Sequence, residues 1–425
     1  MILAVDRTDV EMLVLISAGA IVAGLLITYL VTWRWRPGPS AAFVWRYLYP
    51  ALLAGLAVAT VMLGVSGTRL VLDSRDGKLV KIVHNPELPG YYAQVASTPT
   101  LLVLQVSSRN ELVSAAVFSL SANDVGGWAL FFPAELIVPV SKGTAALDKI
   151  YAQYGADGPG GIRPVLAKLL DADFDSVVNL KADTMASLIV PVAPLQYTLL
   201  DAVRIANGKS TSTLLPKGPV RITTQSDIVN ATEIIGRDEA TTTRFTRQVQ
   251  FWTAWIGAVR AAPDKAAAFP ASSESTELVR FIRGLASNPD SRIEQATFTE
   301  QPFNGSILYI GDVTKIKSVA ASMIPYPLPY EAGARVRVDV RNGVGNFDLN
   351  EPMNRKLVAA GAQIIVLGNA DTFTVGQTSV VYYDEAMKPR ADALARAIKA
   401  TDVRFEERLD SSVDVTVTIG ADFVP

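Results

Sequence analysis

The sequence predicts an α/β protein with two N-terminal transmembrane helices, a large domain on a mixed central sheet and a small C-terminal α+β domain. Two long uncharged apolar runs open the 425-residue chain, and strand-like apolar runs alternate with helical segments after them. Apolar residues make up 49% of the chain and charged residues only 19%. A charged share below the usual quarter, together with this apolar content, is typical of membrane segments rather than disorder.

The residue counts exclude several kinds of chemistry. The formal net charge is −2, and a near-neutral chain without basic tracts argues against nucleic acid as a partner. The chain has no cysteine and a single histidine, His84, which excludes disulfides, cysteine nucleophiles and Cys/His zinc sites. Any catalysis must therefore use carboxylates, hydroxyls, Arg and Lys, with oxygen ligands wherever a metal is bound.

Residues 1–67 are predicted to be a two-helix membrane anchor. The runs 12–31 and 48–65 carry no charge, and each is close to the ~20 residues that a helix needs to cross a bilayer. The residues before the first run are acidic, whereas a cleaved signal peptide starts with basic residues. We therefore expect a retained helix rather than a signal peptide; the alternative is a pair of buried core helices.

The orientation of the anchor follows from the connector between the two runs. It carries Arg34, Arg36 and Arg46 and no acidic residue. The positive-inside rule places such a loop in the cytoplasm. We therefore expect localisation in the cell membrane, with everything after residue 67 extracytoplasmic.

Residues 68–323 are predicted to form one α/β domain, because near-continuous apolar strands between helices are typical of a sheet buried on both faces. The glycine-rich run at 155–161 is expected to be a flexible connection, since it lacks the Lys-Ser/Thr of a phosphate loop. A helix rich in Arg and aromatic residues is expected at 240–259. The predicted strands are 100–108, 112–120, 128–140 and 176–180.

Residues 324–333 hold three prolines and are predicted to be an extended linker. Beyond them, at 334–425, the strand and helix pattern restarts and predicts a separate α+β domain of about 90 residues, a size that can fold alone. Arg335, Arg337 and Arg341 alternate with valines on its first strand. A solvated face is the interpretation we favour for them, and an anion site is the alternative.

The helix at 240–259 carries the candidate binding site. Arg244, Arg247 and Gln248 are three or four residues apart, so they can share one polar face. Two guanidinium groups with an amide donor suit a phosphate or pyrophosphate, which Arg can bind in bidentate fashion. The alternative is a surface helix with ordinary ion pairs.

Several motifs in the same order resemble the LytR-CpsA-Psr (LCP) family, whose members transfer glycopolymers from a polyprenyl-pyrophosphate lipid to the bacterial cell wall. The resemblance runs from about residue 100 to 259, through LFFPAELIVPV, LDKIYAQYG, LLDADFDSVVNL and RFTRQVQF. After the proline-rich segment, VRVDVRNGVG, TSVVYYDE and DVTVTIGADF resemble the small LytR C-terminal domain. The resemblance implies the fold and the extracytoplasmic location, and assigns phosphate binding to Arg244, Arg247 and Gln248.

The chain departs from the family where acids and arginines should converge on the pyrophosphate and its magnesium. Ala134 and Glu135 occupy the slot of an Arg-Asp pair, so Glu135 is the remaining candidate for a catalytic carboxylate. Gln105 and Ser107 fill an early Gly-x-Asp slot, and Val113 stands near the position of another Asp. We assign no metal ligands; Mg²⁺ is expected only if the chain is active.

Three functions fit these observations. The one we favour is a catalytically degenerate envelope protein, a pseudoenzyme, that binds a polyprenyl-linked glycan, peptidoglycan or other envelope proteins. The alternative is an active phosphotransferase with a rearranged site. The second alternative is an interaction scaffold in which the C-terminal domain is the functional part.

Overall fold

The computed structural model describes residues 74–75, 78–79 and 83–425, apart from 209, 238, 274–275 and 409–411. The two predicted membrane-spanning runs, 12–31 and 48–65, lie outside these residues. Within the described ranges, no helix combines the length and the apolar character that crossing a membrane requires. β1 (Ser74–Arg75) and β2 (Lys78–Leu79) form a short antiparallel pair in a different unit from residues 92–409 and 413–425.

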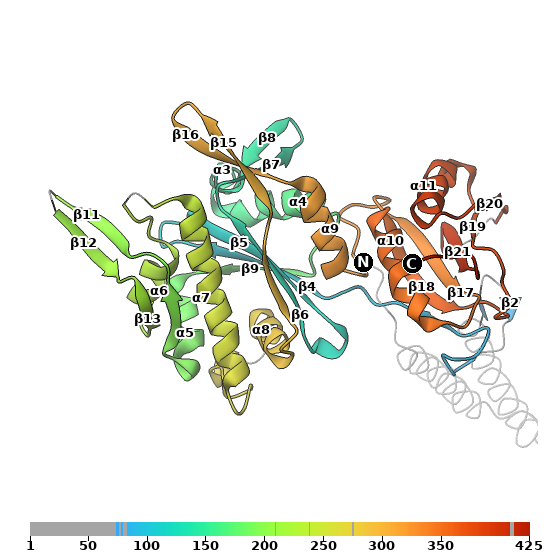
Figure 1. Ribbon diagram of the computed structural model, residues 1–425, viewed down its shortest axis with the longest axis horizontal. Coiled ribbons are helices and arrows are strands. Elements are labelled where there is room, and N and C mark those ends of the chain that lie inside the picture. The colour runs from blue at the N-terminus through green and yellow to red at the C-terminus, as the bar shows by residue number, and fades with distance from the viewer. Residues whose placement is uncertain are drawn as a thin grey trace, which may run out of the picture. The chain divides into compact units, whose positions relative to one another are not determined.

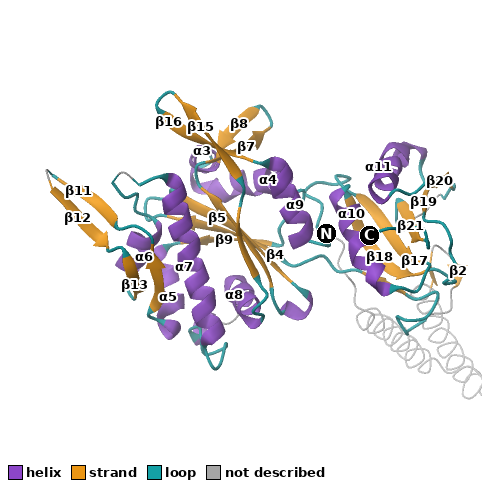
Figure 2. Ribbon diagram, in the orientation of Figure 1, coloured by secondary structure: helices purple, strands orange, loops and turns teal. Residues whose placement is uncertain are grey.

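A five-stranded mixed sheet forms the centre of the larger unit (Figures 1 and 2). Its order is β14-β6-β5-β4-β9, with β4, β5 and β6 antiparallel and the two outer strands parallel to their neighbours. Every residue of β4 and β5 is buried, as the continuous apolar runs predicted. The strands are β4 (Thr100–Val106), β5 (Leu112–Leu120), β6 (Gly127–Pro133), β9 (Ser176–Leu180) and β14 (Arg292–Gln295).

Helices cover both faces of this sheet, because alternate residues of each strand point to opposite sides. Leu101 and Val103 pack into one core with α5–α8, and Leu102 and Leu104 pack into the other with α3, α4 and α9. The central sheet is therefore the middle layer of three. The helices are α3 (Leu147–Gln153), α4 (Gly158–Leu170), α5 (Ala182–Ile189), α6 (Gln225–Thr232), α7 (Thr241–Ala261), α8 (Glu277–Ser287) and α9 (Val313–Met323).

Smaller sheets extend from this body. β7 and β8 join the hairpin β15–β16 in a four-stranded sheet, and the pair β11–β12 projects as a separate arm (Figure 1). The pair β10–β13 packs into the core beside α6 and α7. These strands are β7 (Leu136–Val140), β8 (Gly143–Ala146), β10 (Leu195–Leu199), β11 (Val203–Asn207), β12 (Ser210–Leu215), β13 (Gly218–Ile222), β15 (Phe298–Phe303) and β16 (Ser306–Gly311).

Two local predictions are corrected. The single strand expected at 128–140 is two strands in different sheets, because a turn at Ala134–Glu135 follows Pro133, whose missing N–H ends ladder pairing. The glycine-rich run at 155–161 is not a flexible break but leads into α4. A Cβ on Gly158 would come within 2.5 Å of the Tyr151 ring, so the glycine allows close packing.

The C-terminal region is a six-stranded mixed sheet of order β20-β19-β21-β17-β18-β3, packed against α10 and α11. Its edge strand β3 precedes the central sheet in the chain and pairs antiparallel with β18. The C-terminal sheet is therefore completed by residues from outside 334–425. The elements are β3 (Tyr92–Gln94), β17 (Val336–Asn342), β18 (Ala362–Asn369), β19 (Ser379–Tyr382), β20 (Asp402–Phe405), β21 (Val415–Ile419), α10 (Asn350–Ala359) and α11 (Lys388–Ile398).

Residues 324–333, predicted to be an extended linker, are held against neighbouring elements by packing and hydrogen bonds over most of their length. Ile324 is 1% exposed and belongs to the core beside α9. Thr98 exchanges two hydrogen bonds with the backbone of Tyr326, and the Leu328 carbonyl accepts one from Asp173. Proteolysis at this segment therefore requires local unfolding.

Arg335 ties the C-terminal region to the end of α4. Its guanidinium pairs with the Asp171 carboxylate at 2.7 Å and donates to the carbonyls of Asp171, Val358 and Ala362. It is 5% exposed, so the solvated face predicted for this residue is wrong, although the side chain of Arg337 is 47% exposed. Burial lowers the pKa of Arg335, an effect that the charge of Asp171 opposes.

We predict that Arg335→Met lowers the free energy of unfolding by about 3–5 kcal/mol, because it leaves a carboxylate and buried carbonyls without their donor. Urea denaturation measures this loss, and proteolysis at 324–333 should become faster. The matched control is Arg337→Met, whose exposed pair with Asp414 is worth at most about 1 kcal/mol. Equal effects of the two substitutions would contradict the role of Arg335.

Candidate functional site

The predicted site residues come together at one end of the central sheet. Arg244, Arg247 and Gln248 lie on the first three turns of α7 and are all buried. Glu135 lies in the turn between β6 and β7. The structure therefore places these four residues around one region, as the resemblance implied, and the contacts of each decide what it can bind.

The guanidinium group of Arg247 is fully used by contacts within the protein. Its guanidinium is 3% exposed and holds the Glu239 carboxylate at 2.8 Å. The remaining N–H groups donate to the carbonyls of Asn230, Ala231 and Ile234 at 2.6–2.8 Å. All five donors of the side chain are thus used to close the loop between α6 and α7. In this arrangement Arg247 has no donor left for a phosphate.

Gln248 belongs to a buried network of neutral groups. Its amide donates to the Thr232 carbonyl at 2.7 Å, and Gln105 donates to the Thr232 hydroxyl at the same distance. Ser114 in turn donates to Gln105. In the family's Gly-x-Asp slot, Gln105 stands at the glycine and Ser107 at the acid, so neutral side chains fill the slot in this chain.

Arg244 forms an ion pair with Glu135, the candidate catalytic carboxylate. The side chain of Arg244 is 8% exposed and that of Glu135 is 31% exposed. The second carboxylate oxygen of Glu135 is buried and finds no hydrogen-bond partner among the described residues. The two charges of the pair neutralise each other, so an anion that binds Arg244 competes with the carboxylate of Glu135.

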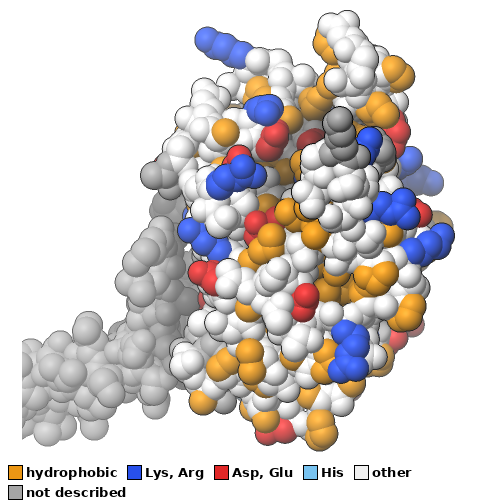
Figure 3. Space-filling model, turned by 90° about the vertical axis from the view of Figure 1, so that its left-hand side faces the viewer, with side chains coloured by type: hydrophobic (Ala, Val, Ile, Leu, Met, Phe, Trp, Pro, Cys, Tyr) orange, Lys and Arg blue, Asp and Glu red, His pale blue; other side chains and the backbone are white. Residues whose placement is uncertain are grey.

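The surroundings add negative charge. Arg109 and Glu111 pair at 3.4 Å in the β4–β5 turn, and Glu233 follows α6. Burial raises the pKa of Glu233, and the charge of Arg109 opposes this. Burial likewise raises the pKa of Tyr197 to about 12. On the face drawn in Figure 3, charges of both signs are interspersed.

The donor set does not fit a magnesium ion. Mg²⁺ in phosphoryl-transfer sites is held by one or two well-placed carboxylates. In the described chain, no three Asp, Glu or His side chains gather as metal ligands. Glu135, the candidate carboxylate here, is held by Arg244. No step through a metal is therefore derived for this site.

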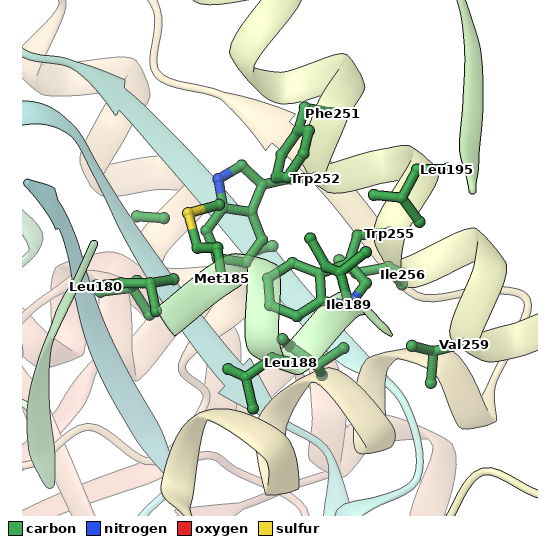
Figure 4. Close-up of a cluster of buried hydrophobic side chains, with 14 of the residues drawn as sticks. Leu180, Met185, Leu188, Ile189, Leu195, Phe251, Trp252, Trp255, Ile256 and Val259 are labelled. Atoms are coloured by element: carbon green, nitrogen blue, oxygen red, sulfur yellow. The ribbon is translucent and has the colours of Figure 1, made fainter. Parts of the chain in front are cut away.

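The apolar space beside α7 is filled by side chains (Figure 4). An isoprenoid tail would need an apolar channel, for which residues 101–104 and 188–190 are the candidate walls. Leu101 and Leu188 instead pack into the core around Trp252, which stacks on Trp255 with ring centroids 5.2 Å apart. Val190 is 67% exposed and points elsewhere. An isoprenoid chain could enter only by displacing these rings.

A separate pocket of about 180 Å³ lies on the outer side of α7. It was not predicted, because its walls are ordinary polar residues that no sequence motif singles out. Its charged lining residues are Asp201, Glu239 and Arg247, and the last two pair with each other, so Asp201 leaves one net negative charge in the pocket. The remaining lining residues are Leu199, Leu200, Thr242, Thr243, Thr246, Arg247 and Gln250.

Comparison with known protein families agrees with the resemblance found for the C-terminal region. Residues 335–423 match the family described as LytR cell envelope-related transcriptional attenuator. The predicted LytR C-terminal domain is thereby confirmed. No curated protein sequence matches the chain.

Solved structures similar to this chain include LCP proteins. Bacillus subtilis TagV is 14% identical with a TM-score of 0.41, over 54% of this chain and 97% of its own. YwtF (TagT) with bound octaprenyl pyrophosphate lipid is 13% identical with a TM-score of 0.38, over 58% and 99%. A LytR-Csp2A-Psr enzyme from Actinomyces oris is 14% identical with a TM-score of 0.40, over 56% and 94%. These likenesses assign no activity to this chain.

We predict that Arg247→Ala destabilises the fold by about 3–5 kcal/mol, because Glu239 and three carbonyls lose their donor. Arg247→Lys should recover only part of this, since an ammonium has three donors instead of five. Arg244→Ala should cost about 1–2 kcal/mol, because the carboxylate of Glu135 can reach water. Chemical denaturation measures all three, and an Arg247→Ala variant as stable as the wild type would show that Arg247 is not structural.

Proposed function

We propose that this chain is a membrane-anchored protein of the bacterial cell envelope with an LCP-like fold that does not transfer glycopolymers and acts by binding an envelope partner. The observation that carries the proposal is the saturated guanidinium of Arg247, together with the Arg244–Glu135 pair. The membrane anchor rests on the two uncharged apolar runs at 12–31 and 48–65.

The requirements of phosphoryl transfer support the proposal that this chain does not transfer glycopolymers. Phosphoryl transfer depends on cationic groups and a metal that stabilise charge on the transferred phosphoryl group, and losing one such group costs orders of magnitude in rate. Here one arginine is used for structure and another is neutralised by Glu135. A catalytic role for Glu135 requires breaking that pair.

The packing of side chains supports a function outside the region around Arg244 and Glu135. Binding a polyprenyl-linked glycan without chemistry would still need a channel for the tail, and Trp252 and Trp255 occupy that space. The LytR C-terminal domain, by contrast, has a complete hydrophobic core and well-fixed loops. We therefore assign partner binding to this domain and regard the LCP-like domain as its support.

A transfer assay tests the proposal. The full chain, purified in mild detergent, is mixed with a polyprenyl-pyrophosphate-linked glycan, Mg²⁺ and peptidoglycan, and released polyprenyl phosphate is measured. The wild type should match the protein-free control. Turnover that disappears in Glu135→Gln would overturn the proposal in favour of an active enzyme with a rearranged site.

A binding measurement separates the remaining alternative. Octaprenyl pyrophosphate should leave the Tm of the full chain unchanged. The matched control is Arg221→Ala, because Arg221 is an exposed arginine on β13. A rise in Tm that is lost in Arg244→Ala and retained in Arg221→Ala would instead show that the region around Arg244 binds the lipid without turnover.

A further inference from the structure

Two loops meet at the carboxyl ends of the parallel strands β17 and β18 in the C-terminal sheet (Figure 1). One loop, 343–349, leads into α10, and the other, 370–378, leads into β19. Open sheets of this kind bind ligands outside the carboxyl ends of their strands. The region lies in a different part of the fold from the Arg244–Glu135 pair.

Asn342 fixes the first loop. Its side chain is 1% exposed and its oxygen accepts hydrogen bonds from the backbone of Val344 and Gly345, both at 2.9 Å. Its amide nitrogen donates to the Asn346 carbonyl and the Asn350 side chain, also at 2.9 Å. One buried amide thus satisfies four bonds and holds the loop in a single shape.

The second loop is bound to the first. Val375 donates its backbone N–H to the Gly343 carbonyl, and a Cβ on Gly343 would lie only 2.5 Å from the Val375 side chain. Gly345 has a φ of +76°, and a Cβ there would lie 3.1 Å from the Phe373 ring. Glycine at both positions lets the loops approach closely.

This rigid platform carries two aromatic rings at the surface. Phe347 is 41% exposed, and Phe373 meets it edge to face with ring centroids 6.4 Å apart. An exposed, well-fixed phenyl ring offers a flat apolar face that can be buried by a ligand. Because the loops are held by Asn342 and Gly343, binding costs little ordering of the protein.

The side chains around the rings select the ligand. Asn346, Asp348, Asp371, Thr372 and Thr374 are exposed in the same two loops and supply hydrogen-bond acceptors and donors. The two carboxylates disfavour phosphate-rich polymers. An aromatic face with such a rim suits a pyranose ring, which has an apolar C–H face and hydroxyl groups at its edge.

We propose that Phe347 and Phe373 form a binding site for an uncharged pyranose glycan. This inference rests on the proposed function for its setting in the envelope, and it names the class of partner. The ring faces stack against C–H groups of the sugar, and the acidic and hydroxyl side chains of the rim pair with its hydroxyls.

The test uses the full chain in detergent with two probes: a tetramer of N-acetylglucosamine, and peptidoglycan sacculi stripped of anionic polymers. Affinity for the tetramer is measured by isothermal titration, and sacculus binding by co-sedimentation. Phe347→Ala and Phe373→Ala should each weaken binding at least tenfold. The matched control is Phe405→Ala on β20, since Phe405 is also 41% exposed. Thermal unfolding confirms that each variant is folded.

The proposal fails if the wild type binds neither probe, or if Phe405→Ala weakens binding as much as Phe347→Ala. It also fails if Phe347→Ala abolishes cross-linking to an envelope protein and leaves glycan binding unchanged, which would identify a protein-docking site. The transfer assay does not involve this region, so the glycan site can fail while the non-catalytic function stands.

Discussion

The buried guanidinium of Arg247 is the interaction on which the region around α7 depends. By holding Glu239, two carbonyls in the last turn of α6 and one carbonyl in the α6–α7 loop, it ties these segments to α7 and keeps Thr232 in reach of Gln248 and Gln105. A fully hydrogen-bonded buried Arg is difficult to replace, because removing it strands several buried partners at once. The same contacts use all five donors of Arg247, so the proposal that this region does not bind phosphate rests on the interaction that stabilises it.

The aromatic side chains of α7 form a second set of buried contacts. Trp252 and Trp255 pack against the central sheet and fill the space that a lipid tail would need. The larger α/β domain is thus filled by neutral hydrogen bonds around Gln248 and by aromatic packing around Trp252. We propose instead that the C-terminal domain binds the partner. β3 and Arg335 attach that domain to the rest of the chain at two separate places.

Much of the fold could be predicted from the sequence, because continuous apolar runs and helical spacing report burial directly. The strands expected at 100–108 and 112–120 and the helix expected at 240–259 were found in this way. The LytR C-terminal domain was found by the resemblance of its motifs to that family. The site was harder. The spacing of Arg244, Arg247 and Gln248 shows that they share a face, but not that this face is turned inward, and the partner Glu239 comes from a loop without a motif. Likewise, β3 has three residues and no periodicity to detect, and Arg335 alternates with valines as an exposed residue would. The membrane anchor at 1–67 remains a prediction.

The most direct measurement of the central claim is the NMR signal of the Arg247 Nε–H group in full-length protein labelled with ¹⁵N-arginine, assigned with Arg247→Lys. If the guanidinium is a structural clamp, this signal exchanges slowly with solvent and does not move when octaprenyl pyrophosphate is added. A signal that exchanges fast and shifts on addition of the lipid would show an arginine available to phosphate, and would contradict the account.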